Sequence, residues 1–383
     1  MVASAAPCPV AIVGGGPTGL ALALTLQRQG IASSLFEARE RGAGRRDARI
    51  LALSHGSRQI LDTLGVWAQL EATPIAAIHV SQRGSFGRTR LSAAEQALPA
   101  LGYVVAAGSL CAALEQALDS AGVVFHDNTR VLRVDSESGS TSVRVHSREG
   151  ETDAALVVYA EGGGTAADDP GVCVHDYAQS AVICTVDCVA PHHHVAYERF
   201  TDSGPLALLP CGKGYAVVYT CASAAAPALI ELGDAEFLAR LQAHFGTRLR
   251  FAAATPRQVY PLALRYRRSP IAQRAVWLGN AAQTLHPVAG QGFNLALRDV
   301  AELGRCLRGA IDPGDASVLR GYAAARRVDR IATLRSTDAL ARLFGLAWPL
   351  LPTLRGAGLL ALDLVPPLRR FVARRMIFGA RAF

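Results

Sequence analysis

Residues 9–30 read PVAIVGGGPTGLALALTLQRQG, and this stretch decides the fold. The apolar residues at its start predict a short buried strand. Gly14, Gly16 and Gly19 then follow with the spacing G-x-G-x-x-G, and apolar residues continue at helical density as far as Gly30, which is typical of a helix end. A strand, a glycine turn and a helix in this order indicate a Rossmann-like unit that binds a dinucleotide.

The chemistry of a dinucleotide explains each glycine in this turn. The first allows a tight turn, the second lets the backbone approach a pyrophosphate, and the third lets helix and strand pack closely. The N-terminus of the helix offers free N–H groups and a partial positive charge to the phosphates. Residues 32–39, ASSLFEAR, predict a second strand ending at Glu37, where an acidic residue would bind the adenosine ribose. The position at the start of the chain and the Arg-rich residues after Glu37 favour FAD over NAD.

A second stretch repeats this pattern near the other end of the chain. Residues 274–303 read RAVWLGNAAQTLHPVAGQGFNLALRDVAEL and predict a short strand, a loop rich in Gly and Ala, and a helix. The free N–H groups of a helix that starts after Gly290, Gln291 and Gly292 suit an electron-rich ligand edge, such as that of a reduced flavin. Asn280 is a candidate to bond the ribityl chain or the phosphates.

Residues 279–303 resemble the flavin-contacting segment of the class A aromatic hydroxylases, the para-hydroxybenzoate hydroxylase type. They resemble more closely the ubiquinone-biosynthesis hydroxylases, with the 2-polyprenyl-6-methoxyphenol hydroxylase branch as the nearest match. Residues 47–67 (DARILALSHGSRQILDTLGVW), 78–91 (IHVSQRGSFGRTRL) and 197–210 (YERFTDSGPLALLP) agree with this family. The resemblance therefore covers nearly the whole chain.

The resemblance implies an α/β (α+β composite) fold, with a Rossmann-like FAD-binding domain and a mixed β-sheet substrate domain of the para-hydroxybenzoate hydroxylase type. We assign residues 1–75, 101–174 and 269–340 to a discontinuous FAD-binding domain, 76–100 and 175–268 to the substrate-binding sheet domain, and 341–383 to a C-terminal helical tail. Strand-like stretches such as GYAVVYTCA, residues 214–222, predict a sheet that covers the flavin ring. Tyr197, Phe200 and Tyr260 either line the substrate pocket or pack within this sheet.

The resemblance also implies a set of site residues. The candidates for binding FAD are Gly14, Gly16, Gly19, Glu37, Arg49, Ser109, Val131, Glu161, Asn280, Gly290, Gln291, Gly292 and Asn294. The catalytic candidates are His286 and Pro287, which would form the wall beside the reacting ring. His286 is either a proton relay for the substrate phenol or a loop histidine that bonds the backbone, and both interpretations stay open.

Two positions depart from the pattern of the family. The family usually has an Asp-Gly pair followed by Ser and Arg after a central strand, whereas this chain has Glu161-Gly162-Gly163-Gly164. Ser109 stands near a position where a longer polar residue, often Arg or Asn, contacts the flavin. These departures concern the FAD ribose contact and the NAD(P)H step and leave the two main FAD segments intact, so an active enzyme is expected.

The implied function is that of an FAD-dependent monooxygenase in ubiquinone biosynthesis. It would hydroxylate a polyprenylated phenol of the 2-polyprenyl-6-methoxyphenol type, using NAD(P)H and O2 through a flavin C4a-hydroperoxide, while the protein supplies positioning and a dry site. One alternative is a flavin-dependent reductase or cyclase of isoprenoids on the same fold. Another is a flavin-free assembly subunit of a ubiquinone-biosynthetic complex.

Composition excludes several other classes of function. The formal net charge is +8, but the basic residues are scattered and Lys213 is the only lysine, so no nucleic-acid partner is expected. The 8 cysteines form no CxxC pair and predict free thiols in a reducing cytoplasm. The run His192–His194 predicts an exposed turn and no metal site, because consecutive strand residues point to opposite faces. We see no secretion signal and no uncharged apolar run of about 18 residues, so a cytoplasmic protein is expected.

Residues 344–383 combine apolar stretches with arginines. No acidic residue follows Asp363, whereas five arginines do. Prolines and charges interrupt the segment, so it does not predict a membrane span. It suits either a membrane surface or a partner, and the alternative is a helical cap on the FAD-binding domain. Because a polyprenyl substrate resides in lipid, we expect peripheral contact with the inner membrane.

Overall fold

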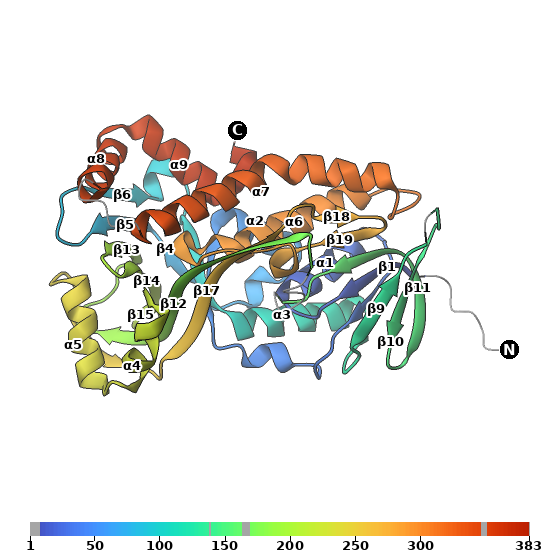
Figure 1. Cartoon of the computed structure of the whole chain (residues 1–383), viewed down its shortest axis with the longest axis horizontal. Helices are drawn as coiled ribbons and strands as arrows, with labels where there is room; N and C mark the ends of the chain where they lie inside the picture. The colour runs from blue at the N-terminus through green and yellow to red at the C-terminus, as the bar shows by residue number, and fades with distance from the viewer. Residues whose placement is uncertain (1–7, 138, 163–168, 346–350, 383) are drawn as a thin grey trace.

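The computed structural model of the chain describes residues 8–137, 139–162, 169–345 and 351–382 (Figure 1). The elongated molecule is built on two large sheets, with a long C-terminal helix running along one side of both. The architecture is α/β, as expected. The strand alternation and the glycine-bounded helix at the start of the chain account for this class.

The first sheet has eight strands and a parallel centre. Its parallel strands stand in the order β19 (Ala275–Trp277), β11 (Gly150–Tyr159), β1 (Cys8–Val13), β2 (Ser33–Phe36) and β8 (Val124–His126). Antiparallel additions are β18 (Ile271–Ala272) at one edge, and β9 (Val131–Asp135) and β10 (Val143–Ser147) beside β11. The first strand and the strand before the second glycine segment are therefore both next to β11, although the sequence separates them widely.

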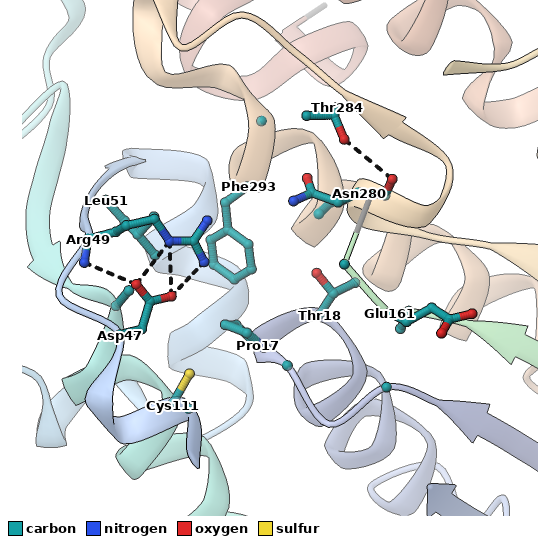
Figure 2. A pocket seen from close by; sticks show the side chains of 18 of the residues that line it. Pro17, Thr18, Asp47, Arg49, Leu51, Cys111, Glu161, Asn280, Thr284 and Phe293 are labelled. Carbon is teal, nitrogen blue, oxygen red and sulfur yellow. Dashed lines mark hydrogen bonds and ion pairs between the residues drawn. The ribbon is translucent and has the colours of Figure 1, made fainter. Parts of the chain in front are cut away.

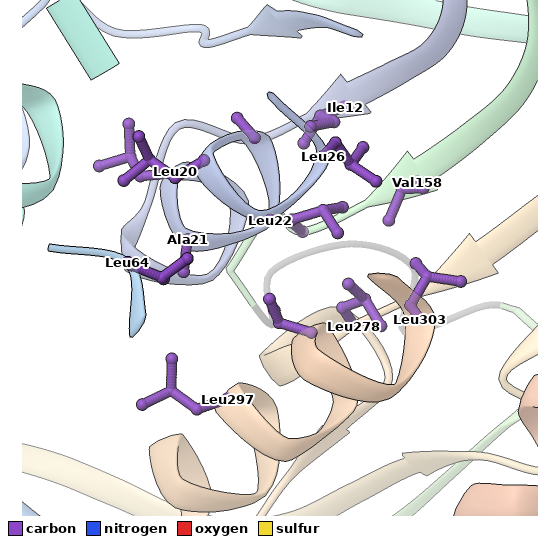
Figure 3. Close-up of a cluster of buried hydrophobic side chains, with 14 of the residues drawn as sticks. Ile12, Leu20, Ala21, Leu22, Leu26, Leu64, Val158, Leu278, Leu297 and Leu303 are labelled. Carbon is purple, nitrogen blue, oxygen red and sulfur yellow. The ribbon is translucent and has the colours of Figure 1, made fainter. Parts of the chain in front are cut away.

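Three helices pack around this sheet and form the main core. They are α1 (Pro17–Gln27), α3 (Ala107–Ala121) and α6 (Gln291–Leu307), and α1 contacts both of the others. Figure 3 shows Leu22 and Leu26 of α1 in the same apolar cluster as Leu303 of α6. Burying each of these side chains contributes about 1.5–3 kcal/mol. A Cβ atom on Gly304 would lie 2.5 Å from Cγ2 of Thr25, so glycine allows α6 to approach α1 closely.

The second sheet has nine strands. Its paired strands are antiparallel, apart from β13 and β5, which are parallel. Its strands are β5 (Ala77–Gln82), β6 (Arg88–Ser92), β12 (Val172–Cys188), β13 (Val195–Thr201), β14 (Gly204–Cys211), β15 (Gly214–Ala222), β16 (Phe251–Ala254), β17 (Gln258–Arg267) and β20 (Gln283–Thr284). One face packs against α4 (Ala226–Glu231) and α5 (Asp234–Phe245), and Val182 and Cys184 of β12 point to it. Because strand side chains alternate, Ala181 and Ile183 face the other way, into a cavity.

Smaller elements join the two sheets. A three-stranded sheet contains β3 (Ile50–Ser54), β7 (Gly102–Ala106) and β4 (Thr73–Ile75), and α2 (His55–Thr63) follows β3. The C-terminal part consists of α7 (Ala316–Gly345), α8 (Leu351–Leu364) and α9 (Pro366–Phe378). Figure 1 shows α7 along the side of both sheets, with α8 and α9 next to β5 and β6.

Most predicted elements are present, and several boundaries differ. The predicted strand 214–222 coincides with β15. Strand β12 begins at Val172, before residue 175, where the substrate-binding sheet domain was expected to resume. Residues 76–100 supply two strands, β5 and β6, and β20 from the range 269–340 pairs with the second sheet. Helix α7 passes residue 341 without a break, so the expected tail boundary falls inside a helix. The division into two domains and a tail stays a prediction.

Candidate functional site

Both glycine segments line one cavity of about 1080 Å³. Gly14 and Gly16 contribute from the start of α1, and Pro287, Gly290 and Gly292 contribute from the start of α6. Figure 2 shows Pro17 and Thr18 on one side of this space, with Asn280, Thr284 and Phe293 across from them. Two chain segments separated by more than 250 residues therefore share one binding space.

The first glycine turn is shaped by close backbone contacts on one side and open space on the other. Gly14 has φ +112°, and a Cβ atom there would lie 2.6 Å from the backbone nitrogen of Glu161. A Cβ atom on Gly19 would overlap the carbonyl oxygen of Gly14, although Gly19 itself does not line the cavity. A Cβ atom on Gly16 would meet nothing within 4 Å, and no side chain caps the α1 N-terminus there. The helix start is thus open towards a ligand.

Glu37 lies at the end of β2, buried beside the same cavity. Its Oε2 accepts a hydrogen bond from the Gly15 backbone at 2.7 Å, and its Oε1 accepts from Nε of Arg39 at 2.9 Å. Burial alone would raise the pKa of Glu37, but the hydrogen bonds from Arg39 and Gly15 hold it below its ordinary value. The carboxylate is therefore ionised near neutral pH, which suits a ribose hydroxyl donor.

Glu161, where the chain departs from the pattern of the family, is also part of the cavity wall. Glu161 and Gly162 line the cavity just after β11, while Gly163 and Gly164 lie outside the described residues. Burial raises the pKa of Glu161, and the nearby Arg130 opposes this shift. The side chain of Glu161, which is one methylene longer than the Asp of the family, therefore still lines the cavity.

The second glycine segment presents one face of α6 to the cavity. Gly290 has φ +59° and lies against Ala52, and a Cβ atom on Gly292 would meet nothing within 4 Å. Phe293 and Ala296 continue this lining face. No side chain caps the α6 N-terminus at Gly290. Like α1, α6 therefore begins with an N-terminus open to a ligand.

Gln291 and Asn294 lie on another face of α6 and do not line the large cavity. Both instead line a neighbouring cavity of about 70 Å³. The amide of Asn294 is fully used within the protein. Its Oδ1 accepts from the Ser54 backbone at 2.7 Å and from Oγ of Ser57 at 2.6 Å. Its Nδ2 donates to the carbonyl oxygens of Ala52 and Gly290 at 2.8 and 2.7 Å. These hydrogen bonds clamp the start of α6, and the predicted direct contact of Asn294 with FAD is not supported by its position.

His286 is buried in the loop before α6 and lines the cavity. Its Nδ1 accepts a hydrogen bond from the Val288 backbone at 3.1 Å, as the second of the two open interpretations proposed. Its Nε2 has no hydrogen-bond partner among the described residues, and its ring meets Tyr177 edge to face at 5.4 Å. Burial lowers the pKa of His286 to about 4, so the ring is neutral at pH 7. The hydrogen bond from Val288 agrees with the second interpretation, and the role of a proton relay stays open.

Of the other predicted FAD-binding residues, three line the cavity and one does not. Val131 and Asn280 line the cavity, and so does Arg49, whose guanidinium pairs with Asp47 (Figure 2). Ser109 is exposed and does not line it. The lining residues of α3 are Ala107 and Cys111, which are four residues apart and so share a face, whereas Ser109 points away from that face. The predicted contact of Ser109 with the flavin is therefore not supported by its position.

The second sheet closes the cavity with an apolar wall. Its lining residues are Ala181, Ile183, Leu209, Val218, Tyr260, Pro261, Leu262 and, at the edge strand β20, Thr284. Of the three aromatic residues in question, Tyr260 lines the cavity. Tyr197 packs edge to face on Phe245 in the core below the sheet, at 5.3 Å, and Phe200 does not line the cavity.

Several lining residues were not predicted from the sequence. They are Pro17, Thr18, Phe36, Arg39, Arg46, Thr129, Arg130, Arg133, Tyr159 and Phe293. The helical phase of α6 could have identified Phe293, because it lies one turn before Ala296 on the face that contains Gly292. Nothing in the spacing of residues 129–133 marks them as site residues.

The residues present fit FAD. The cavity exceeds the usual size of small-ligand pockets, about 300–1,000 Å³. It has an uncapped helix N-terminus at Gly16 for phosphates, an ionised carboxylate at Glu37 for a ribose, and a second uncapped helix N-terminus at Gly290. Arg39, Arg46 and other arginines of the wall add positive charge that suits a pyrophosphate.

The described residues also place the cysteines, the exposed histidines and the apolar segments of the helices. Seven cysteines are free thiols there, and no group of His, Cys, Asp and Glu could hold a metal ion. His193 and His194 lie in a turn and are exposed. None of the helices in the described ranges carries an apolar segment long enough to cross a membrane.

Comparison with known proteins agrees with this geometry. A family described as the FAD binding domain matches residues 7–336. The chain is 33% identical to ubiquinone hydroxylase UbiL of Rhodospirillum rubrum, over 95% of this chain and 88% of that protein. It is 30% identical to the 3-demethoxyubiquinol 3-hydroxylase of Escherichia coli, over 95% of this chain and 97% of that protein.

A solved structure shows the same fold across nearly all of the chain. The p-nitrophenol 4-monooxygenase PnpA from Pseudomonas putida superposes with a TM-score of 0.76. The match covers 98% of this chain and 99% of that one at 18% sequence identity. At this identity the likeness concerns the fold alone.

Proposed function

The chain belongs to the FAD-binding family that includes the ubiquinone hydroxylases, and from this premise we propose that it hydroxylates the ring of a polyprenylated phenol in ubiquinone biosynthesis. It is an FAD-dependent monooxygenase of the aromatic hydroxylase type. Bound FAD supplies the redox chemistry, in which NAD(P)H is the reductant, one atom of O2 enters the ring and the other leaves as water. The protein itself has to bind FAD and the substrate, orient them towards each other and shield them from water.

Gly16 and Glu37 would hold the pyrophosphate and the ribose of the cofactor. The α6 N-terminus at Gly290 and Gly292 would lie against the flavin ring system, where its partial positive charge favours the negative charge of the reduced ring. Asn294 takes no part in this contact and holds the helix start in place.

The apolar wall is the observation that carries the proposed substrate class. Among the described residues, the second sheet contributes no ionised side chain to the cavity. Ile183, Leu209 and Val218 would lie against the substrate ring, and such a surface suits a neutral phenol with alkyl substituents better than a ring that carries a carboxylate. The same surface excludes water from the reacting ring.

His286 and Pro287 would complete the pocket beside the substrate. Pro287 lines the cavity next to the start of α6. Because the His286 ring is neutral and its Nδ1 accepts a backbone hydrogen bond, its other nitrogen carries the proton. Its role would be to fix the loop that holds Pro287, not to remove the phenol proton.

The test uses protein reconstituted with FAD, NAD(P)H and a short-chain polyprenyl phenol. We expect NAD(P)H oxidation, O2 uptake and a product that contains one oxygen atom from isotopically labelled O2. Ile183→Trp should fill the apolar wall and abolish the labelled product while FAD still binds. NAD(P)H oxidation with an unlabelled, reduced product would instead indicate a reductase, and the proposed hydroxylation would be wrong.

A further inference from the structure

Helix α8 exposes an apolar face to solvent. Its exposed positions follow the three- and four-residue spacing of one helix face, and all but Thr353 are apolar: Thr353, Leu354, Ala357, Gly358, Leu360, Ala361 and Leu364. Leu354 is 54% exposed and Leu364 is 69% exposed. The two ionisable residues of the helix, Arg355 and Asp363, are only partly exposed and lie off this face. A helix at a water-facing surface normally has the opposite distribution.

Close contacts fix α8 in this orientation. A Cβ atom on Gly356, on the inner side, would lie 2.5 Å from the carbonyl oxygen of Phe86 in the turn between β5 and β6. Nε2 of Gln82 donates a hydrogen bond to the carbonyl oxygen of Pro352 at 2.8 Å. Rotating the helix to bury its leucines would break both contacts, so the outward face is a stable feature of the fold.

The apolar surface continues beyond α8. Exposed apolar side chains at the end of α8 and in α9 extend it, and we call the whole set the apolar face: Leu354, Leu360, Leu364, Val365 and Leu368. Figure 1 shows α8 and α9 at one end of the molecule, outside β5 and β6. Isolated exposed leucines are common, but exposed apolar residues that gather on two helices in contact mark an interaction surface.

Arginines border the apolar face along α9. Arg370 and Arg374 are exposed, and within the described ranges no carboxylate lies within 4 Å of either guanidinium. Their neighbours are used inside the protein, since Arg369 pairs with Glu95 at 2.9 Å and Arg375 approaches Asp329. The margin of the apolar face is therefore cationic.

We propose that the apolar face binds the surface of an anionic lipid bilayer, with α8 in the interfacial layer and Arg370 and Arg374 on lipid phosphates. Aliphatic side chains beside unpaired guanidinium groups match the boundary between acyl chains and anionic headgroups. The proposal rests on the proposed function only in that a polyprenyl substrate resides in the same bilayer.

Helix α9 connects this surface to the site. Its inner residues Ala373, Met376 and Ile377 line the cavity of about 70 Å³, together with Ala52. Ala52 also lines the large cavity. A bilayer on the apolar face would thus lie one helix away from the binding space for FAD and the substrate.

The experiment measures flotation of the full-length, FAD-loaded protein with vesicles of phosphatidylcholine, with and without phosphatidylglycerol. Leu354→Ser combined with Leu364→Ser should lower the bound fraction by about tenfold or more. The matched control places the same changes on exposed apolar residues elsewhere, Val189→Ser with Ile311→Ser, and should bind like the wild type.

A second pair of variants tests the charge. Arg370→Gln with Arg374→Gln should lower binding to the anionic vesicles by about tenfold or more at low salt and leave binding to neutral vesicles unchanged. Arg320→Gln with Arg327→Gln, on the exposed side of α7, is the control. Unchanged flavin absorbance in every variant shows that the fold is intact and separates this test from the one for hydroxylation.

Two results would overturn the proposal. One is equal vesicle binding by the wild type and the Leu354→Ser, Leu364→Ser variant. The other is a wild type that ignores vesicles but sediments as a dimer, with the same variant sedimenting as a monomer, because a second copy of the chain would then cover the apolar face.

Discussion

A Cβ atom added to Gly279 would lie 2.8 Å from the hydroxyl oxygen of Thr18. Gly279 opens the loop before the second glycine segment, and Thr18 lies in the first turn of α1. The two ends of the cofactor site are thus in direct contact, and glycine at 279 makes this contact possible. Gly279 also has φ +56°, which L residues other than glycine rarely adopt.

Gly279→Ala should destabilise the protein and weaken FAD binding. The left-handed backbone costs about 1 kcal/mol for alanine, and the overlap with Thr18 adds about 1–3 kcal/mol. Gly309→Ala is the matched control, since Gly309 has φ +72° with nothing within 4 Å of its added Cβ. Urea unfolding of both apoproteins checks this. Equal losses in the two variants would mean that the contact with Thr18 contributes nothing.

Substitution of Asn294 and of Asn280 should distinguish a residue that stabilises the fold from one that contacts the cofactor. Asn294→Ala leaves four hydrogen-bonding groups without their partner and should lower the free energy of unfolding of the apoprotein by about 2–4 kcal/mol. Asn280→Ala removes an exposed side chain and should change it by less than about 0.5 kcal/mol, while weakening FAD binding about tenfold. Denaturant unfolding and FAD titration measure the two effects. The opposite pattern would return Asn294 to direct cofactor contact.

His286 should make stability depend on pH in a defined window. Its pKa is about 4 in the folded protein and about 6.5 when unfolded, so the unfolded chain binds more protons between these values. Its contribution is present above pH 6.5 and is lost as the pH falls towards 4, by up to about 3 kcal/mol. His286→Gln should flatten the unfolding free energy between pH 4.5 and 6.5, and exposed His193→Gln should not. A carbon-detected NMR titration that finds His286 charged at pH 6 would contradict this.

Asp329 should be a strong determinant of stability. It is buried and pairs with Arg298 and Arg326, each at 2.8 Å, and it accepts a hydrogen bond from the Ala380 backbone. Burial alone would raise the pKa of Asp329, but the two arginines hold it below its ordinary value. The stability that it contributes is therefore present above pH 4 and is lost as the pH falls through this lowered pKa.

Asp329→Asn leaves buried Arg298 without its counter-charge, whereas Arg326 keeps its pair with Asp299 at 2.6 Å, and should cost about 3–5 kcal/mol at pH 7. Asp153→Asn, which breaks the exposed pair with Arg144, should cost less than about 1 kcal/mol. The difference between the two variants should shrink as the pH is lowered below 4. A difference that does not change with pH would show that the ionised form of Asp329 is not what stabilises the fold.

Local patterns in the sequence were enough to predict the first glycine turn, Glu37 and the Rossmann-like unit, whereas the two-domain fold class came from the resemblance to a family. These features depend on residues close together in the chain, because strand, turn and helix each have a short period. The contact of Thr18 with Gly279 was not predictable from spacing. It depends on how α1 and the 279–281 segment meet in the folded protein, and a single sequence holds no direct record of such contacts.

The prediction of cofactor contacts at the start of α6 was limited because it did not take the direction of each side chain into account. Gly290, Gln291, Gly292 and Asn294 were all predicted to contact FAD, but a helix turns by about 100° per residue. Gly292 therefore faces the cavity, whereas Gln291 and Asn294 face β3 and α9. The same geometry explains why Ala107 and Cys111 line the cavity and Ser109 does not.

The central claim is that both helix starts hold parts of one FAD molecule, and titration of the apoprotein with FAD tests it most directly. Gly16→Val and Gly292→Val place side chains where the protein has nothing within 4 Å. Gly233→Val, at another helix start, and Gly321→Val, in exposed α7, are matched controls with equally open surroundings. We expect both site variants to weaken FAD binding by about tenfold or more, neither to shift the unfolding of the apoprotein, and both controls to bind FAD like the wild type. Wild-type affinity in either Gly16→Val or Gly292→Val would contradict the central claim.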